Sequence, residues 1–248
     1  MVRSPYYTSY SFGPGGVTPA VKTLLIANIG IFLLQWLAGG VAGRLLIEWF
    51  GLTPARVFTQ LRIWQPVTYM FLHADLLHLL FNMLVLWMFG VDLERRWGQR
   101  GFLRYYFICG IGAAFTTLVA SWLPFDFAEE IYRVPTIGAS GAIYGILVAF
   151  GLLFPDRIIL LFVFPVPARI YVFIAAALVL WSSISDPAGG TAHLAHLGGM
   201  AVGYFYLTRG RGGPWAEIKY RWVKWRMNRL RRRFDVHQGG RGWDRRIH

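Results

Sequence analysis

The chain has 248 residues, of which 56% are hydrophobic, 17% are aromatic and only 15% are charged. This composition is typical of a polytopic membrane protein and argues against an ordinary soluble domain. The single cysteine, Cys109, excludes an intrachain disulfide and argues against a cysteine-based metal cluster. Because Cys109 lies in an apolar run, we expect it to be a packing residue.

Six apolar runs, several of them short, follow one another along the chain. They cover residues 20–42, 76–91, 102–123, 137–154, 168–185 and 192–208. A bilayer core of about 30 Å needs roughly 20 mostly apolar helical residues per crossing, and a helix satisfies every backbone group within its own segment. The sequence therefore predicts an all-α, polytopic membrane domain of six transmembrane helices over residues 20–208.

The remaining segments differ in composition from these runs. Residues 43–75 mix apolar, aromatic and proline residues, are too broken to span a bilayer, and are predicted to form a structured interfacial loop. Residues 1–19 lack a charged head followed by an apolar core, so we expect a cytoplasmic segment and no cleaved signal peptide. Residues 209–248 place apolar side chains at helical spacing among basic ones, which fits either an interfacial helix or a solvated tail.

Charge placement predicts the orientation, because basic residues are retained on the cytoplasmic side of a membrane. Basic residues gather after the second and fourth runs and in residues 209–248, which hold 13 of the 25 Lys and Arg. The connections after the third and fifth runs are acidic. Both termini are therefore expected to be cytoplasmic, and the second, fourth and sixth runs enter from the outer face.

Polar side chains gather at the outer ends of those three runs. They are His73, His78, Asn82, Ser140, His193 and His196. Polar groups in a bilayer are costly unless they are paired or line a water-filled cavity, so their agreement in depth predicts one shared site. Taken singly, Ser140 beside glycines is better explained by helix packing than by catalysis, and His196 is better explained by interhelical hydrogen bonding.

Glycines recur at four-residue spacing on two of these runs. The pairs are Gly141 and Gly145 in the fourth run, and Gly199 and Gly203 in the sixth. Small residues at this spacing let helix backbones approach closely. Such an approach would bring the imidazole of His196 within hydrogen-bonding reach of the Ser140 hydroxyl.

Three separated motifs resemble the signature of the rhomboid intramembrane serine proteases. They are GASG at 138–141 followed by Tyr144, HADLLHLLFN at 73–82, and AHLGGMAVG at 195–203. The likeness covers about residues 20–208, in the right order. The serine motif is not the nucleophile elbow of soluble hydrolases, because Ala142 stands where that motif needs glycine.

The resemblance implies a role for each of these residues. Ser140 would be the nucleophile and His196 the general base and later the acid. His78, Asn82 and the backbone N–H of Ser140 would form the oxyanion hole. Tyr144 would stack under the histidine.

Supporting positions complete the expected site. Gly138 would admit a substrate carbonyl, Gly141 and Gly199 would serve close packing, and His73 would have a structural or loop-anchoring role. His193 is expected to cap its helix or contact lipid headgroups. The sequence places no acid beside His196, since the nearest, Asp186, is ten positions upstream in a loop. A Ser-His dyad is therefore predicted in place of a triad.

One position departs from the family pattern. Many members carry Trp-Arg in the outer loop, whereas this chain has Trp64, Gln65 and Pro66. An arginine that would anchor the loop in lipid is thus missing at position 65. Arg62 is a candidate substitute.

The predicted function is hydrolysis of peptide bonds in or near transmembrane segments of other membrane proteins, without metal or cofactor. The expected partners are transmembrane substrates and membrane lipid, and not nucleic acid, because membrane orientation accounts for the net charge of +13. A bacterial inner membrane is the expected location, and the oligomeric state is left open. Alternatives are a catalytically silent rhomboid-like pseudoprotease that binds clients, and a transporter or channel, which would need polar residues along a continuous path.

Overall fold

The computed structural model describes residues 14–124, 126–161, 164–185 and 190–209. The predicted cytoplasmic segment up to residue 13 and the basic tail from residue 210 lie outside them. The elements in chain order are α1 (Pro19–Phe50), α2 (Pro54–Gln60), α3 (Gln65–Thr68), η1 (Tyr69–Phe71), α4 (Leu76–Ala120), α5 (Asp126–Arg133), α6 (Ser140–Leu153), β1 (Ile158–Leu161), β2 (Phe164–Pro167), α7 (Ala168–Ser185) and α8 (Gly190–Thr208).

Each apolar run predicted from the sequence lies mostly within a helix, although residues 121–123, 137–139 and 154 are outside the helices, and two helices are longer than predicted. Helix α1 continues to Phe50 beyond a sharp bend at Gly39 and Gly40, so the first eight residues of the predicted loop 43–75 are helical. Helix α4 contains both the second and the third run, which meet at Gly98, where φ is 72°. Glycine accepts a positive φ without the steric cost that other residues meet, so the chain can turn there.

Two of the described helices, α1 and α4, are long and apolar enough to cross a membrane on their own. Helix α6 and residues 168–181 of α7 are shorter apolar helices. The described chain is thus mostly helical and rich in apolar helices, as a membrane protein of this kind requires.

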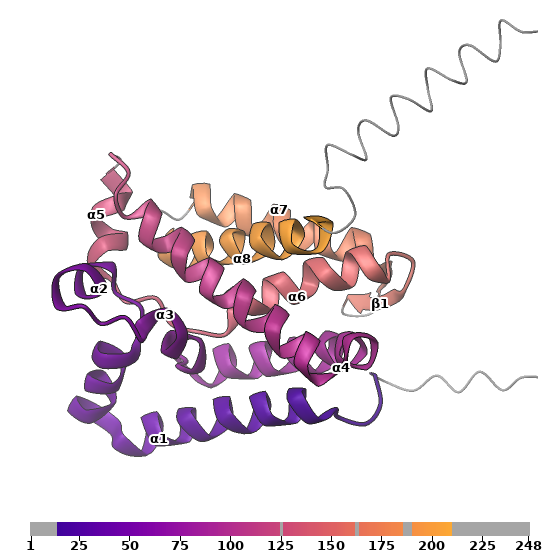
Figure 1. Ribbon diagram of the computed structural model, residues 1–248, viewed down its shortest axis with the longest axis horizontal. Helices are drawn as coiled ribbons and strands as arrows, with labels where there is room; N and C mark the ends of the chain where they lie inside the picture. The colour runs from indigo at the N-terminus through magenta and orange to yellow at the C-terminus, as the bar shows by residue number, and fades with distance from the viewer. Residues whose placement is uncertain (1–13, 125, 162–163, 186–189, 210–248) are drawn as a thin grey trace, which may run out of the picture. The chain divides into compact units, whose positions relative to one another are not determined.

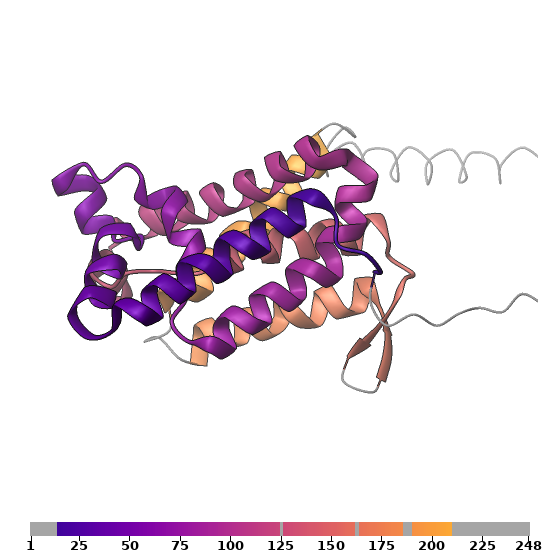
Figure 2. The same ribbon diagram turned by 90° about the horizontal axis from the view of Figure 1, so that it is seen from below.

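The helices between residues 14 and 206 form one unit in which α4 is central. Helix α1 packs on one side of α4 and α6 on the other, and α7 packs on α6. The short helices α2, α3 and α5 gather at one end of these helices, and the strand β1 lies at the opposite end (Figure 1). The bend of α1 and the crossing of α1 over α4 are visible in Figure 2.

A buried carboxylate ties the start of α1 to α4. The two oxygens of Glu94 accept hydrogen bonds from the hydroxyl of Thr18 and from the backbone N–H groups of Ala20 and Val21, at 2.5–2.9 Å. The first N–H groups of a helix have no partner within it, and an anion is favoured there by the helix dipole. Glu94 of α4 therefore caps the start of α1. The sequence places Glu94 in the charged connection after the second apolar run, and this position did not suggest a capping role.

The outer loop closes the other end of α1. The guanidinium groups of Arg56 and Arg62 donate to the backbone oxygen of Glu48 at 2.6 and 2.8 Å. The fully buried amide of Gln65 donates to the oxygen of Trp49 at 3.2 Å and accepts from a backbone N–H of the loop. These donors satisfy the last carbonyl groups of α1, which have no partner within the helix.

This arrangement corrects the suggestion that Arg62 anchors the loop in lipid. Its side chain lies inside the protein, with the guanidinium carbon 4.2 Å from the centroid of the Trp49 ring. Arg62 therefore fastens the loop to α1. Gln65 also fastens the loop to α1, through its hydrogen bond to the backbone oxygen of Trp49. Its side chain is short, neutral and fully buried, whereas the charge of an arginine at this position would lose its hydration.

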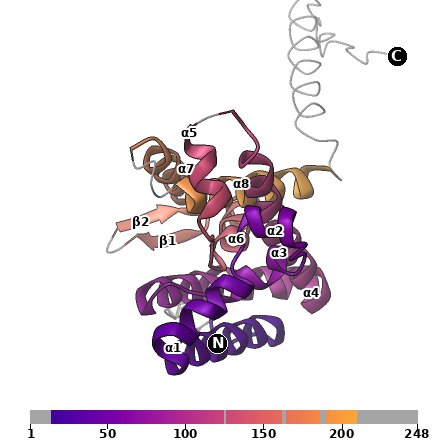
Figure 3. The ribbon, with the colours of Figure 1, turned by 90° about the vertical axis from the view of Figure 1, so that its left-hand side faces the viewer.

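The described chain is mostly helical, as predicted, and it also contains one short two-stranded hairpin. Strands β1 and β2 pair antiparallel between α6 and α7, with Ile158 opposite Pro167 and Leu161 opposite Phe164. Figure 3 shows the pair lying beside the helices. The sequence predicted only a connection with basic residues here, and no strand, because residues 155–167 were counted with neither adjoining run.

Candidate active site

The start of α6 presents Ser140 at the end of an extended segment held from both sides. Thr136 pairs with Leu52 through two backbone hydrogen bonds of 2.8 and 3.0 Å. The N–H of Gly138 then donates to the backbone oxygen of Tyr69 at 2.9 Å. Gly138 has φ of 123°, a conformation that favours glycine. Ser140 follows as the first residue of α6, where a backbone N–H has no partner within the helix.

Helices α6 and α8 approach so closely that only glycine fits between them. A Cβ atom on Gly199 would lie 1.9 Å from the backbone oxygen of Gly141. A Cβ atom on Gly203 would lie 3.1 Å from the Cα of Gly145. The two predicted glycine pairs therefore meet each other, and their contact sets the distance between the serine helix and the histidine helix.

Ser140 and His196 are brought together by this contact. The hydroxyl oxygen of Ser140 lies 2.7 Å from Nε2 of His196, which is a hydrogen bond. The ring of Tyr144 stacks on the imidazole, with centroids 4.4 Å apart and planes inclined by 29°. Tyr144 is one turn after Ser140 on the same helix face, so one helix supplies both the hydroxyl and the stacking surface.

The other ring nitrogen of His196 has no hydrogen-bond partner among the residues that the structure describes. The acid nearest in sequence, Asp186, lies outside them. Within the described ranges no group of three or more His, Cys, Asp or Glu side chains could hold a metal ion. The predicted absence of metal and cofactor stays a prediction.

His78 faces the serine from the first turns of α4. A Cβ atom on Gly138 would lie 2.8 Å from Cε1 and Nε2 of His78 and 3.6 Å from the Ser140 hydroxyl oxygen, so ring and hydroxyl flank one glycine. Nδ1 of His78 accepts from the N–H of Ala74 at 3.4 Å. In the neutral ring the proton is then on Nε2, the nitrogen that faces the glycine.

Asn82 lies one turn further along α4 and is also buried. Its amide nitrogen donates to the backbone oxygen of His78 at 2.7 Å. This bond uses one of the two amide hydrogens and leaves the other available. Asn82 is thus less free to serve the site than the helical spacing alone indicated.

A cavity of about 260 Å³ opens beside these side chains. It is lined by His78, Phe81, Asn82, Val85, Ser140, Ile143, Tyr144, Leu147, Tyr171, Ala175 and His196. All of the predicted catalytic and oxyanion residues therefore border a single space. Tyr171 was not predicted, because it lies in the apolar run of α7, outside the three motifs that single out the other site residues.

His73 and His193 lie at the edges of the site. The backbone of His73 exchanges two hydrogen bonds with the side chain of Gln35, at 3.1 and 3.3 Å, which fastens the outer loop to α1. Burial, with a smaller effect of the neighbouring His78, lowers the pKa of His73 to about 4, so this imidazole is neutral at pH 7. The ring of His193 is edge-on to His196, with centroids 6.2 Å apart.

Comparison with known proteins gives consistent matches. The family model described as "Rhomboid domain" matches residues 60–211. The chain is 32% identical to Rhomboid protein 1, mitochondrial, of Saccharomyces cerevisiae over 206 residues, which cover 82% of this chain and 55% of that protein. It is 34% identical to Rhomboid protease GluP of Bacillus subtilis over 130 residues, covering 52% and 24% of the two chains.

A third relative, Rhomboid protease AarA of Providencia stuartii, is 29% identical over 152 residues, covering 56% of this chain and 53% of the relative. The chain spans between 24% and 59% of the length of the first relatives it matches. These relatives include both bacterial and mitochondrial proteins, so they do not support a bacterial inner membrane over a mitochondrial membrane. The family match covers more than half of the chain, from the outer loop to the end of α8, and the chain therefore belongs to the rhomboid family.

Proposed function

We propose that the protein is an intramembrane serine endopeptidase that cleaves other membrane proteins in or near their transmembrane segments. The observation that carries this proposal is the 2.7 Å hydrogen bond between the Ser140 hydroxyl and Nε2 of His196. A serine hydroxyl is a weak nucleophile until a base within hydrogen-bonding distance accepts its proton. Two relatives that are named rhomboid proteases support the same reaction.

In this mechanism His196 acts first as base and then as acid. It accepts the Ser140 proton as the hydroxyl oxygen attacks the scissile carbonyl, and it then protonates the leaving amine. Water hydrolyses the acyl-enzyme with the same base. Stacking against Tyr144 holds the imidazole in the orientation that an acid would fix in a triad.

The oxyanion of the tetrahedral intermediate would be bound by Nε2–H of His78 and the backbone N–H of Ser140. Both donors lie beside Gly138, whose missing side chain leaves room for the substrate carbonyl. One such donor typically contributes about 100-fold to 1,000-fold to the rate. Asn82 would contribute through its second amide hydrogen.

We propose a membrane placement in which residues 20–208 cross the bilayer six times and both termini lie on the side of the basic connections. The site then opens to the opposite face, near the short helices of the outer loop. A substrate helix must unwind locally, because the carbonyl groups of a helix are already hydrogen-bonded. Glycines or other weak helix formers near the cleaved bond would ease that step.

The reaction is tested by reconstituting the full chain with a panel of single-span membrane proteins. Cleavage within or near the span, located by mass spectrometry, is expected, together with covalent labelling of Ser140 by a fluorophosphonate. Clients that co-purify with the protein but stay intact, with Ser140 unlabelled, would instead indicate a pseudoprotease. Solute flux through the reconstituted vesicles would indicate a transporter.

Tyr144 provides a graded test of the dyad. Changing Tyr144 to alanine removes the stacked ring, and a ring pair of this kind stabilises by about 0.5–1.5 kcal/mol, so a fall in kcat of up to roughly tenfold is expected. The matched variant Tyr144→Phe keeps the ring and should stay close to wild type. Equal loss in both variants would show that the hydroxyl, and not the stacking, is what matters.

A further inference from the structure

Tyr69 is a buried residue of the outer loop that the proposed reaction leaves without a role. It belongs to the short helix η1 and is only 1% exposed. Its backbone oxygen accepts a hydrogen bond from the N–H of Gly138 at 2.9 Å. Its phenol hydroxyl donates to the backbone oxygen of Gly110 in α4 at 2.7 Å. One residue therefore joins the outer loop, the segment before Ser140 and α4.

Two glycines make room for Tyr69 between α4 and α6. A Cβ atom on Gly110 would overlap the side chain of Met70, the residue after Tyr69, so η1 lies directly on α4 at this point. A Cβ atom on Gly141 would lie 3.1 Å from the Tyr69 hydroxyl oxygen. The phenol thus packs against the first turn of the helix that carries the serine. Its hydroxyl uses the second lone pair of a carbonyl within a helix.

Gly138 needs a hold from outside α6, because it lies before that helix in an unusual conformation. Its φ is 123°, and Ser140 begins α6 two residues later. The backbone bridge between Thr136 and Leu52 ends two residues earlier. The hydrogen bond to Tyr69 therefore acts where the chain turns toward the serine.

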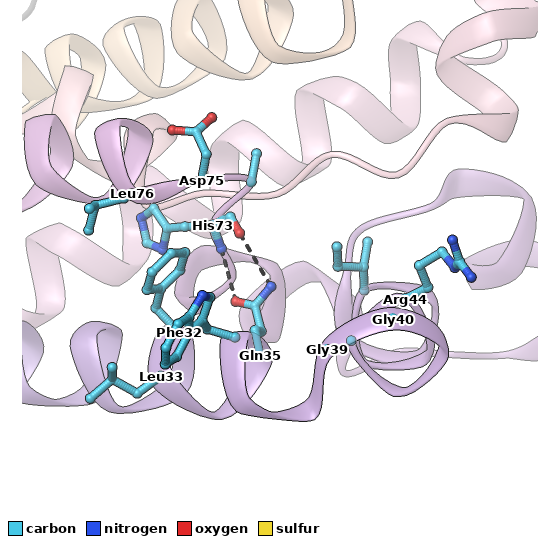
Figure 4. Close-up of a pocket in the computed structure, with 13 residues that line it drawn as sticks. Phe32, Leu33, Gln35, Gly39, Gly40, Arg44, His73, Asp75 and Leu76 are labelled. Atoms are coloured by element: carbon cyan, nitrogen blue, oxygen red, sulfur yellow. Dashed lines mark hydrogen bonds between the residues drawn. The ribbon is translucent and has the colours of Figure 1, made fainter.

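The segment from Tyr69 to His78 holds Gly138 from two sides. Tyr69 accepts from its N–H, and a Cβ atom on Gly138 would lie 2.8 Å from Nε2 of His78. Between these residues the segment is tied to α1, because the side chain of Gln35 exchanges hydrogen bonds of 3.1 and 3.3 Å with the backbone of His73. Figure 4 shows Gln35 reaching from α1 to this backbone. The segment is thus fastened to both α1 and α4 as it passes the site.

We propose that Tyr69 is a positioning residue that sets the distance between the two oxyanion donors, an inference that rests on the proposed function. One donor, Nε2–H of His78, belongs to α4, and the other, the backbone N–H of Ser140, belongs to α6. Gly138 lies between them, and the Tyr69 carbonyl orients it. The bond from the phenol to Gly110 fixes that carbonyl relative to α4. Donors that are placed in advance need no rearrangement when the charge develops.

Tyr69→Phe tests this role, because it removes the phenol oxygen and keeps the ring between α4 and α6. A fall in kcat of about tenfold is expected, less than the loss of a whole donor, which costs about 100-fold to 1,000-fold. KM should stay within about twofold, since Tyr69 is not among the residues that line the cavity beside Ser140. Initial rates of cleavage over a range of substrate concentrations separate the two constants. An unchanged kcat overturns the proposal.

Thr68→Val is the matched control in the same loop. The hydroxyl of Thr68 donates to the backbone oxygen of Phe50 at 2.7 Å, so this variant also loses a bond that fastens the loop, here to α1. Its kcat should stay near the wild-type value. An equal fall in kcat in Thr68→Val and Tyr69→Phe would show that general loosening of the loop is the cause, and would overturn the specific role of Tyr69.

A double-mutant cycle with His78→Ala separates positioning from stability. Once the ring of His78 is gone, the distance between the two donors no longer matters. Tyr69→Phe should then slow fluorophosphonate labelling of Ser140 by less than about threefold, because residues that act as a unit are not additive. Losses that multiply fully overturn the role of Tyr69 in the oxyanion hole.

Hydrogen exchange gives a readout that needs no reaction. The peptide that contains the N–H of Gly138 should exchange about tenfold faster in Tyr69→Phe than in wild type, and as in wild type in Thr68→Val. Unchanged exchange in Tyr69→Phe overturns the link between the phenol and Gly138. Absence of both cleavage and labelling in wild type refutes the proposed reaction, while the exchange result still decides whether Tyr69 holds Gly138.

Discussion

Replacement of Ser140 by alanine is expected to lower the rate of substrate cleavage by at least about 10⁴-fold, because no other group can form the acyl-enzyme. The fold should be unaffected, since the hydroxyl makes one hydrogen bond among the described residues, to the imidazole of His196. Fluorophosphonate labelling should disappear together with cleavage. The measurement is initial-rate cleavage of one purified single-span substrate in vesicles.

Ser121→Ala is a matched control for that variant. Ser121 follows the last residue of α4, and its hydroxyl donates to the backbone oxygen of Leu118 at 2.8 Å, away from the site. Its loss should leave cleavage near the wild-type rate. Undiminished cleavage in Ser140→Ala would exclude Ser140 as the nucleophile.

Gly199→Ala is expected to abolish measurable activity and to lower stability at the same time. The added Cβ atom would lie 1.9 Å from the backbone oxygen of Gly141, and a backbone atom cannot turn aside as a side chain can. Helices α6 and α8 must separate, which breaks the bond between Ser140 and His196. A misplacement of about 1 Å can cost on the order of 100-fold in rate, and overpacking costs about 1–3 kcal/mol.

The control for this glycine is Gly30→Ala in α1. A Cβ atom at Gly30 would meet nothing within 4 Å, and alanine favours a helix over glycine by about 0.5–1 kcal/mol. This variant should be as stable as wild type or slightly more stable, with full activity. Thermal unfolding and fluorophosphonate labelling measure both variants, and normal labelling of Gly199→Ala would show that the dyad does not depend on this contact.

The apolar helices could be located from hydropathy because each contains a run of apolar residues that the connecting segments lack. Their ends were less predictable. Residues 43–50 were counted with the loop because the connection 43–75 as a whole mixes apolar, aromatic and proline residues, although these eight residues are helical. Glu94 lies in the charged connection after the second run, and nothing in the local sequence shows that the start of α1 packs onto it.

Within the site, the meeting of Ser140 and His196 could be predicted because two glycine pairs and a known family pattern point to the same helix contact. The particular hydrogen bonds could not. The hydrogen bond from the Asn82 amide to the backbone oxygen of His78 competes with the oxyanion role that was predicted for Asn82. The hydrogen bond from the N–H of Gly138 to the backbone oxygen of Tyr69 joins residues far apart in the sequence. Such partners depend on three-dimensional packing, which periodicity does not describe.

Helix α1 is fastened at both tips by groups from other elements, Glu94 at its start and the arginines and amide of the outer loop at its end. Helices ordinarily fray from their termini, where backbone groups are exposed. Here the least supported point is instead the glycine pair in the middle. Local opening of α1 should therefore begin at the bend and spread toward the two fastened ends.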